Sequence, residues 1–356
     1  MSTVSLLTRR TLTRTLPRIS TPPEPNRAPI NPFTPAVKMT TATFKHIDLS
    51  AHAPDTKPWS KVDADANSFT LAPHLRPVHN LRGHEADFTT DTSGFAVLRA
   101  PSSEKLFLDD AAVRGPYYAE VEALLRRAPP AGSGSDSGSA VKKVVIFDHT
   151  IRRRTPDAAR APVQQVHVDQ TPGAAAARVR RHVAAAAEAE ELLKGRWQLV
   201  NVWRPIENPA TDYPLAVIDW RSTAPEDFVP VDLLYPKRVD SVMDGQVSSE
   251  EEGGDDDRGK EVRPDEASWF SKEGYEVKGE TMAVAPSDRH RFYYQKDMTP
   301  DEVLLLKCYD SWGEGEPAGK KGIAVRTPHT AFVDPATPEG TPGRQSIEVR
   351  CLVFYE

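Results

Sequence analysis

The sequence is short of cysteine and of long apolar runs, and both shortages limit what the protein can be. Its 356 residues include two cysteines, Cys308 and Cys351. Each lies in an apolar run, so we expect two buried thiols rather than a disulfide. No apolar run approaches the length of a transmembrane helix. We therefore expect an intracellular protein without a membrane partner.

Neither sign of charge dominates the sequence, and it lacks common nucleotide-binding motifs. Lys and Arg number 45 against 51 Asp and Glu, for a net charge of -6, which gives no reason to expect nucleic acid as a partner. The sequence contains no glycine-rich dinucleotide signature, no P-loop and no G-x-S-x-G of a serine hydrolase. These absences argue against a dinucleotide-dependent enzyme, a P-loop nucleotide hydrolase and a serine hydrolase.

The first 38 residues differ in composition from the rest. They are rich in Ser, Thr and Arg, and their first acidic residue is Glu24. A mitochondrial transit peptide has this composition, but the prolines between residues 17 and 35 oppose an amphipathic helix. We expect a disordered or targeting tail at 1–38 and one domain at 39–356. The expected location is the cytoplasm, with mitochondria as the alternative.

Two segments of that domain have the composition of loop insertions. The Gly/Ser-rich run at about 131–140 is typical of a flexible loop. The acidic run at about 241–262 is typical of an exposed, disordered insertion, and it lacks the ligand spacing of an EF-hand.

Short strand-like runs dominate the chain after residue 140, whereas residues 40–110 carry few strong periodic signals. Two helices are expected: one at 116–128, and one of about two dozen residues that begins at Pro172 after Thr171 as its N-cap and ends before Gly195. This combination predicts a mainly β fold with flanking helices (α+β), built on a sandwich or barrel core. The strands are expected at 144–147, 164–170, 197–204, 214–220, 279–285, 289–296, 302–309, 322–329 and 346–355.

A His-x-Asp pair lies at the end of one predicted strand. His167 and Asp169 are two positions apart, so both side chains point to the same face of a strand. A second imidazole on that face would complete a two-His, one-carboxylate set, which is typical of non-haem Fe(II) oxygenases. The plainer interpretation is a strand-end histidine followed by an aspartate that caps the next turn.

The chain has ten histidines, so nine compete to supply the second imidazole. We favour His329, the last of them, because it follows a predicted strand at 322–329 and so matches the position of the first pair. His290 is disfavoured because arginines flank it on both sides.

The last predicted strand carries a possible carboxylate-binding unit. Arg344, Ser346, Glu348 and Arg350 share one face of it. An arginine with a nearby hydroxyl can hold a carboxylate, the guanidinium by two hydrogen bonds and the serine by one more. The alternative is a ladder of Arg and Glu side chains on a solvent-facing strand, which suits Arg350 better than the Arg-x-Ser unit.

Taken together, these segments resemble a known family over roughly residues 140–356. The sequence is similar to Fe(II)/2-oxoglutarate-dependent oxygenases of the gibberellin-desaturase-like and cephem-methoxylase-like group of fungal and bacterial enzymes. The segments that carry the resemblance are HVDQTP, NVWRPI, RFYYQKDMTPDEVLLLKCYDS, RTPHTAFVDP and RQSIEVRCLVFY.

The resemblance implies a double-stranded β-helix (jelly-roll) core. It implies Fe(II) held by His167, Asp169 and His329, with 2-oxoglutarate as cosubstrate and O₂ as oxidant. Arg344, assisted by Ser346, would bind the distal carboxylate of 2-oxoglutarate, with Arg350 as the alternative. The expected substrate is a small organic molecule of secondary metabolism that is hydroxylated or desaturated, while 2-oxoglutarate is converted to succinate and CO₂.

Two other functions are compatible with such a fold. One is a jelly-roll binding protein without catalytic turnover, and the other is a cupin-like metal-dependent hydrolase or isomerase. The Arg-x-Ser unit argues against the second, because those reactions need no dicarboxylate cosubstrate. The sequence makes no prediction of oligomeric state.

Overall fold

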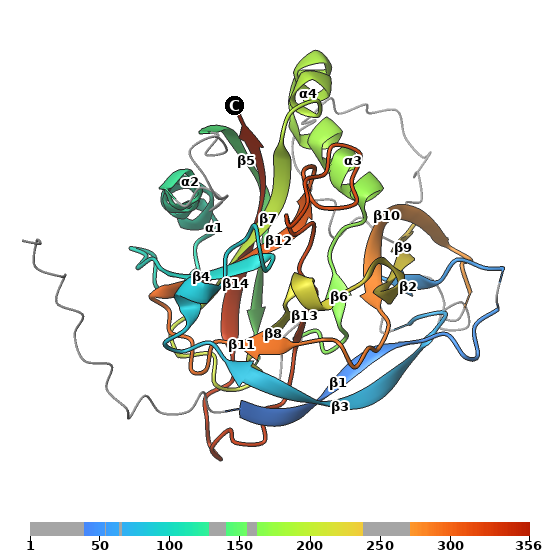
Figure 1. Cartoon of the computed structure of the whole chain (residues 1–356). Coiled ribbons are helices and arrows are strands. Elements are labelled where there is room, and N and C mark those ends of the chain that lie inside the picture. Colours follow the sequence, from blue (N-terminus) through green and yellow to red (C-terminus); the bar gives the residue numbers. More distant parts are fainter. Residues whose placement is uncertain (1–38, 54, 64–65, 128–139, 155–161, 238–270) are drawn as a thin grey trace, which may run out of the picture. The chain divides into compact units, whose positions relative to one another are not determined.

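Two β-sheets build the protein, and helices pack against one of them (Figure 1). The computed structural model describes residues 39–53, 55–63, 66–127, 140–154, 162–237 and 271–356. These residues belong to one compact unit, Val37–Glu356. The predicted tail at 1–38, the acidic insertion and nearly all of the Gly/Ser-rich loop lie outside the described residues.

The larger sheet, called sheet A here, contains nine of the described strands. All neighbouring strands are antiparallel except β3 with β11 and β2 with β9. Across the sheet the order is β1 (Met39–Asp48), β3 (Thr70–Asn80), β11 (Phe292–Tyr294), β8 (Leu215–Ile218), β13 (His329–Ala331), β6 (His167–Val168), β10 (Tyr275–Val284), β9 (Phe228–Pro236) and β2 (Trp59–Lys61).

The smaller sheet, sheet B, is antiparallel and contains five of the described strands. Their order is β4 (Phe95–Arg99), β12 (Glu302–Asp310), β7 (Trp197–Pro205), β14 (Gln345–Tyr355) and β5 (Val141–Arg153). The described helices are η1 (Glu85–Asp87), α1 (Asp110–Ala112), η2 (Val113–Tyr117), α2 (Tyr118–Arg127), α3 (Pro172–His182), α4 (Ala186–Leu192), η3 (Trp220–Ser222) and η4 (Pro225–Asp227).

The side-chain alternation of β14 decides what each face of sheet B contacts. Ile347, Val349 and Cys351 pack with α2 in one hydrophobic cluster. The residues between them point to the opposite face, which is directed toward sheet A. On that inner face, Leu352 and Phe354 pack against α3 and α4. The candidate site therefore lies between the sheets, on the part of the inner face that these helices leave uncovered.

The predicted mainly β fold with flanking helices is confirmed, and the last strand matches its prediction closely. Both cysteines are free and buried, as expected. The helix expected at 116–128 is present as α2, although helical structure already begins at Asp110. None of the described helices is long and apolar enough to cross a membrane.

The single helix predicted from Pro172 to Lys194 is wrong. Thr171 does cap its start by accepting a hydrogen bond from the backbone of Ala174. The helix stops after His182, however, and α4 begins at Ala186. At 100° per residue, Val183 and Leu192 would lie about 180° apart on one straight helix. The break allows both side chains to enter the same hydrophobic cluster.

Two further strand predictions were incomplete or wrong. Residues 40–110, which lacked a clear pattern, contain the long antiparallel pair β1 and β3 as well as β2 and β4. The strand predicted at 322–329 is mostly a loop, and His329 begins β13 instead of ending a strand.

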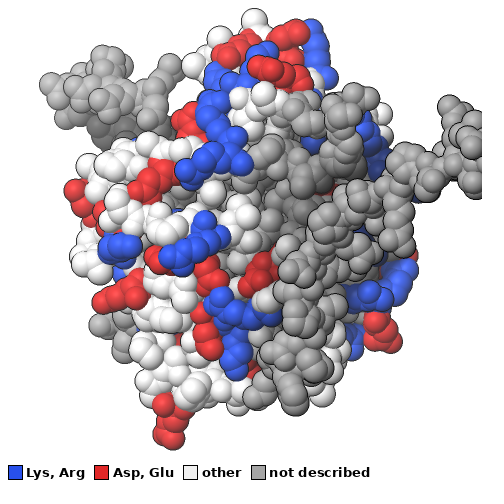
Figure 2. All heavy atoms as spheres, turned by 60° about the vertical axis from the view of Figure 1, so that its left-hand side comes forward, with Lys and Arg blue, Asp and Glu red and all other residues white. Residues whose placement is uncertain are grey.

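Lys and Arg side chains are interspersed with Asp and Glu on the described part of the face shown in Figure 2.

Candidate metal centre and its cavity

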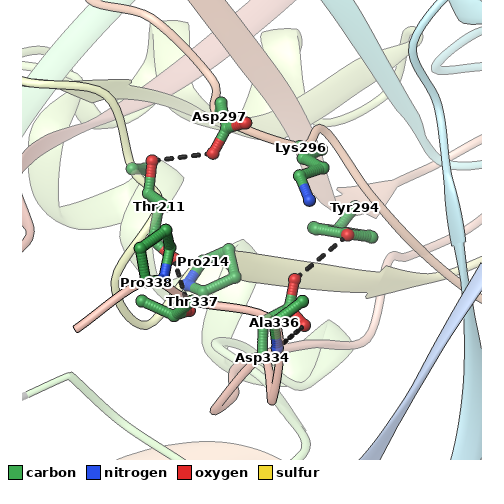
Figure 3. Close-up of a pocket in the computed structure, with 10 residues that line it drawn as sticks. Thr211, Pro214, Tyr294, Lys296, Asp297, Asp334, Ala336, Thr337 and Pro338 are labelled. Atoms are coloured by element: carbon green, nitrogen blue, oxygen red, sulfur yellow. Dashed lines mark hydrogen bonds between the residues drawn. The ribbon is translucent and has the colours of Figure 1, made fainter. Parts of the chain in front are cut away.

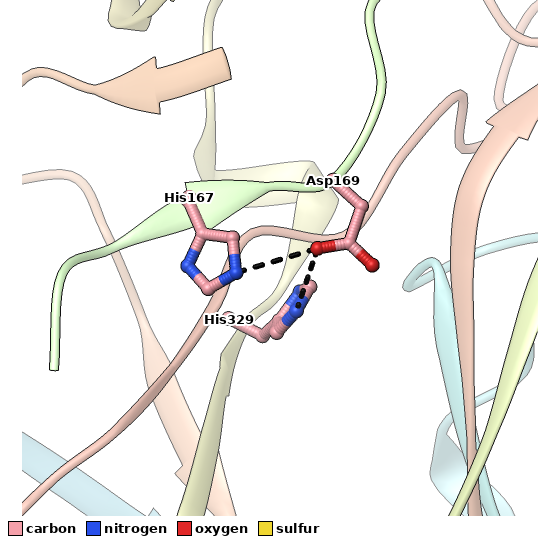
Figure 4. Close-up of side chains that lie close together, drawn as sticks. All are labelled: His167, Asp169 and His329. Atoms are coloured by element: carbon pink, nitrogen blue, oxygen red, sulfur yellow. Dashed lines mark ion pairs between the residues drawn. The ribbon is translucent and has the colours of Figure 1, made fainter. Parts of the chain in front are cut away.

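His167 and His329 are brought together by strand pairing. They are direct partners where β6 and β13 run antiparallel, so their side chains point to the same face. The centroids of the two imidazole rings are 4.5 Å apart. Asp169 follows His167 by two residues and points the same way. Its Oδ1 lies 3.4 Å from Nε2 of His167 and 3.7 Å from Nε2 of His329 (Figure 4).

The hydrogen bonds of the two imidazoles leave the same nitrogen available on each ring. Nδ1 of His167 donates to the carbonyl of Gln165 at 2.8 Å, and Nδ1 of His329 donates to that of Thr327 at 3.2 Å. A carbonyl can only accept, so each Nδ1 carries a proton, and in the neutral imidazole each Nε2 has a free lone pair. Metal-binding histidines characteristically donate their other N–H in this way.

Three potential ligand atoms therefore face one point. Among the described residues, His167, Asp169 and His329 form a group whose ligand atoms all lie within 4.8 Å of one another. Burial alone would raise the pKa of Asp169, but the neighbouring His167, His329 and Arg350 hold it well below its usual value. Burial would lower the pKa of His167, but Asp169 raises it above the usual value. Burial, and then the nearby His167, lower the pKa of His329 to about 4. The second imidazole is thus neutral at ordinary pH, as metal binding requires.

The second oxygen of Asp169 has partners of its own. Oδ2 accepts a hydrogen bond of 2.6 Å from Nδ2 of Asn201, a fully buried residue on β7. Nε of Arg350 lies 3.9 Å from the same oxygen. Asp169 therefore presents Oδ1 to the histidines and Oδ2 to sheet B.

A cavity opens beside these three residues. Arg344 and Arg350 border it, but Ser346, which was predicted to assist Arg344, is buried and does not. Trp203 also lines it. The complete lining is Arg152, Val163, His167, Asp169, Trp203, Leu215, His329, Thr330, Ala331, Arg344, Glu348 and Arg350.

Arg344 is a buried guanidinium that forms no ion pair with a described carboxylate. Its Nη1 donates to the carbonyl of Tyr213 at 2.7 Å, and its Cζ lies 5.6 Å from the centroid of the Trp203 ring. Its Nε has no hydrogen-bond partner, and no carboxylate within the described segments forms an ion pair with it. Burial, followed by the charge of Arg152, lowers the pKa of Arg344 to about 10. The side chain is poised to receive an anion.

Arg350 is already paired. Its Nη1 contacts both carboxylate oxygens of Asp148, at 2.9 and 3.2 Å, and its Nε lies 3.4 Å from Oε1 of Glu348. Burial opposes its charge, but these carboxylates raise its pKa above the usual value. Burial and the neighbouring Asp169 raise the pKa of Glu348. Arg350 thus belongs to an ion-pair network inside the cavity and not to a solvent-facing ladder.

Sequence reasoning missed four residues of this region: Asn201, Asp148, Arg152 and Glu348 as a cavity residue. One signal was available for Asn201. It is a polar residue in the strand WQLVNVWR, where all the other described positions of β7 are also buried. A buried amide in such a strand needs a partner, and the partner is Asp169.

A second cavity lies near the loop after β7 and contains none of the predicted site residues (Figure 3). Its polar side chains are largely bonded to one another. Tyr294 donates to Asp334 at 3.2 Å, and Thr211 donates to Asp297 at 2.7 Å. We assign no function to it.

Comparison with known proteins shows that this chain is similar to oxidoreductases. A family model described as "Oxidoreductase/YMDC permease-like domain" matches residues 46–252 and 262–354. "Hydroxylase/desaturase efuI" of Hormonema carpetanum is 33% identical over 285 residues, covering 78% of this chain and 83% of that protein. "Fe(II)/2-oxoglutarate-dependent dioxygenase nvfI" of Aspergillus novofumigatus is 31% identical, covering 81% and 85%.

A solved structure agrees with these sequence relatives. That of the "iron and alpha-ketoglutarate-dependent endoperoxidase NvfI" superposes with a TM-score of 0.63 at 26% identity, covering 89% of this chain and 98% of that one. The chain therefore belongs to the family that the matching model describes, and to the group of fungal hydroxylase/desaturases and Fe(II)/2-oxoglutarate-dependent dioxygenases to which these relatives belong.

Proposed function

We propose that this protein is an Fe(II)- and 2-oxoglutarate-dependent dioxygenase that hydroxylates or desaturates a small organic molecule. The observation that carries the proposal is the convergence of two imidazole nitrogens and one carboxylate oxygen within 4.8 Å. Three protein ligands leave positions open for a cosubstrate and O₂.

The donor set fits Fe(II). Both Nε2 atoms are free of protein hydrogen-bond donors, and both Nδ1 atoms are fixed by carbonyls. Oδ1 of Asp169 supplies the negative charge. Nitrogen and carboxylate ligands without thiolate suit iron better than a structural zinc site. His167, Asp169 and His329 are therefore the proposed ligands.

Arg344 is the proposed binder of the distal carboxylate of 2-oxoglutarate. It is buried, charged and unpaired, so an incoming carboxylate would satisfy it by charge-assisted hydrogen bonds. Arg350 is a poorer candidate because Asp148 and Glu348 already neutralise it. Ser346 lies on β14, two residues after Arg344. It would assist Arg344 by turning its hydroxyl toward the bound carboxylate.

The bound iron and cosubstrate supply the oxidising power, with 2-oxoglutarate decarboxylated to succinate and CO₂ as O₂ is consumed. The residues of the chain hold the cosubstrate and exclude water. Trp203, Leu215 and Ala331 give the cavity an apolar wall. Such a wall keeps the reacting carbon of the substrate away from solvent.

The charges of the cavity favour an uncharged substrate. Asp148 lies outside the lining but pairs with Arg350, so that Arg152 and Arg344 are balanced by Asp169 and Glu348. The two positive charges of Fe(II) would balance the two negative charges of 2-oxoglutarate. A charged substrate would leave an unpaired charge in a buried site, which costs free energy. A neutral secondary metabolite fits this balance.

The two sheets are proposed to form a double-stranded β-helix. Sheets A and B enclose the site between them, and the superposition on NvfI covers most of the chain. The non-catalytic and hydrolase alternatives retain no specific support, because the cavity keeps a complete ligand set and an unpaired arginine.

An anaerobic titration tests the proposal. Metal-free protein would receive Fe(II) and then 2-oxoglutarate while the visible charge-transfer absorption of the chelated iron is recorded. We expect a band that requires both additions and that is lost in Asp169→Ala. Correctly folded, iron-loaded protein without this band would overturn the oxygenase proposal and favour a binding protein or another metal.

A further inference from the structure

The two sheets contribute differently to the candidate metal centre. Sheet A and the residue after β6 supply the three proposed ligands. Sheet B supplies Asn201 on β7 and Arg350 on β14, which are direct partners in the antiparallel pairing of those strands. Nδ2 of Asn201 lies 2.6 Å from Oδ2 of Asp169, and Nε of Arg350 lies 3.9 Å from the same oxygen. One wall therefore presents the ligands while the other holds the far oxygen of the carboxylate.

The orientation of the Asn201 amide is fixed by this contact. Nδ2 faces the carboxylate, because the reverse orientation would set an amide oxygen against a negatively charged oxygen. The cost falls on the other atom, since Oδ1 of Asn201 is buried without a hydrogen-bond partner. An apolar side chain of the same shape would avoid that cost. Asn201 therefore donates a hydrogen bond to Asp169 although its own side-chain oxygen is left without one.

We propose that Asn201 is a positioning residue that makes Asp169 a one-oxygen ligand. With Oδ2 engaged by the amide, only Oδ1 is free to face the metal. Binding through both oxygens would occupy the position that O₂ needs once 2-oxoglutarate is chelated. This inference rests on the proposed function, because it presumes a metal between His167, Asp169 and His329.

Asn201→Leu tests the inference, because leucine keeps the shape of asparagine and removes both polar atoms. Asn208→Ala is the control, because Asn208 is only partly buried and its side chain donates only to the neighbouring Pro209 carbonyl. Each metal-free protein would be titrated with Co(II) in place of Fe(II), following the d–d absorption, whose intensity falls as the coordination number rises. Thermal unfolding of each metal-free protein would be measured alongside.

We expect Co(II) to bind Asn201→Leu about 10- to 100-fold more weakly, with a changed d–d spectrum. The melting temperature of the metal-free variant should change little, because the lost hydrogen bond and the removed orphan acceptor oppose each other. Asn208→Ala should match the wild type in all three measurements. A large fall in melting temperature with unchanged Co(II) affinity and spectrum would overturn the inference and leave Asn201 a purely structural residue.

Asp169→Ala separates this inference from the proposed function. If wild-type protein and Asp169→Ala bind Co(II) equally, the metal site itself is wrong. If Asp169→Ala loses Co(II) while Asn201→Leu behaves as wild type, the metal site stands and only the role of Asn201 fails.

Discussion

At the scale of single residues, Arg344 and Arg350 show how the same side chain acquires different tasks from its neighbours. Arg344 directly precedes β14 and Arg350 lies on it, and both border the cavity. Arg350 has two carboxylates within 3.5 Å, whereas Arg344 has a single carbonyl and an aromatic ring. An anion from outside the chain can therefore be stabilised by Arg344 far more than by Arg350.

Replacing Arg344 by Ala should raise the concentration of 2-oxoglutarate required by about ten- to a hundred-fold. A charge-assisted hydrogen bond contributes about 1.5–3 kcal/mol, and each 1.4 kcal/mol is a factor of ten. The measurement is a 2-oxoglutarate titration followed by succinate release. Arg99→Ala, at an exposed position, is the control and should leave the requirement unchanged.

The same experiment on Arg350→Ala distinguishes the two arginines. That substitution leaves Asp148 and Glu348 without their partner, so its main effect should be on folding stability. If Arg350→Ala raised the 2-oxoglutarate requirement while Arg344→Ala did not, the assignment of the two residues would be reversed.

The proposed metal ligands and the two arginines of the last strand segment were predictable from the sequence, whereas the residues that contact them were not. The two-residue spacing of His167 and Asp169 and the shared face of the last strand are local properties of the sequence. Asn201 contacts Asp169 across a separation of 32 residues, and Asp148 contacts Arg350 across 202. Such contacts depend on sheet pairing, which the alternation of single strands does not reveal.

At the scale of elements, the segment before β13 is held by close backbone packing, which explains why its strand prediction failed. The hydroxyl of Thr327 donates to the carbonyl of Gly94, and the same Thr327 offers its carbonyl to His329. Gly94 has a φ of +88°. Apolar periodicity at 322–329 indicated a strand, but these residues pack against a glycine turn instead of a neighbouring strand.

Gly94→Ala should weaken metal binding by displacing this segment. A Cβ at Gly94 would lie 2.8 Å from the carbonyl oxygen of Arg326 and nearer still to Thr327, besides being strained by the positive φ. His329 would lose its fixed orientation. Titration of the metal-free variant with Fe(II) measures the effect, and Gly83→Ala is the control because it shares the positive φ but has open space around it. Equal metal affinity in the two variants would contradict this account.

At the scale of the whole molecule, a buried cluster of four charges joins sheet B to the loop that leads toward β13. Nζ of Lys307 donates to Asp310 at 2.6 Å, to Asp91 at 3.2 Å and to the carbonyl of Ala324 at 3.0 Å. Arg196 contacts both aspartates. Burial would raise the pKa of Asp310, but Lys307 and Arg196 lower it to about 2.

Lys307→Met should lower the free energy of unfolding by about 3–5 kcal/mol, because it leaves buried carboxylates only partly compensated. Urea unfolding measures this, with Lys105→Met at an exposed position as the control. A loss below 1 kcal/mol would show that Arg196 alone neutralises both aspartates.

Stability should also fall as the solution is acidified. Burial, opposed by a hydrogen bond to Val284, lowers the pKa of His46 to about 4. The unfolded chain binds a proton at His46 from pH 6.5 downward, and the folded protein does not. The contribution is therefore complete above pH 6.5 and is lost toward pH 4, by up to about 2 kcal/mol between pH 6.5 and 5. Urea unfolding across this range should show a smaller loss in His46→Phe than in wild type, and an unchanged loss in His84→Gln.

The direct pairing of His167 with His329 has a consequence for biosynthesis. The two residues are separated by 162 positions along the chain, yet they face each other on neighbouring strands. A nascent chain that has passed the His-x-Asp motif holds only two of the three proposed ligands until His329 has been translated. If these residues are the ligands, a complete iron site can therefore form only on the nearly finished polypeptide.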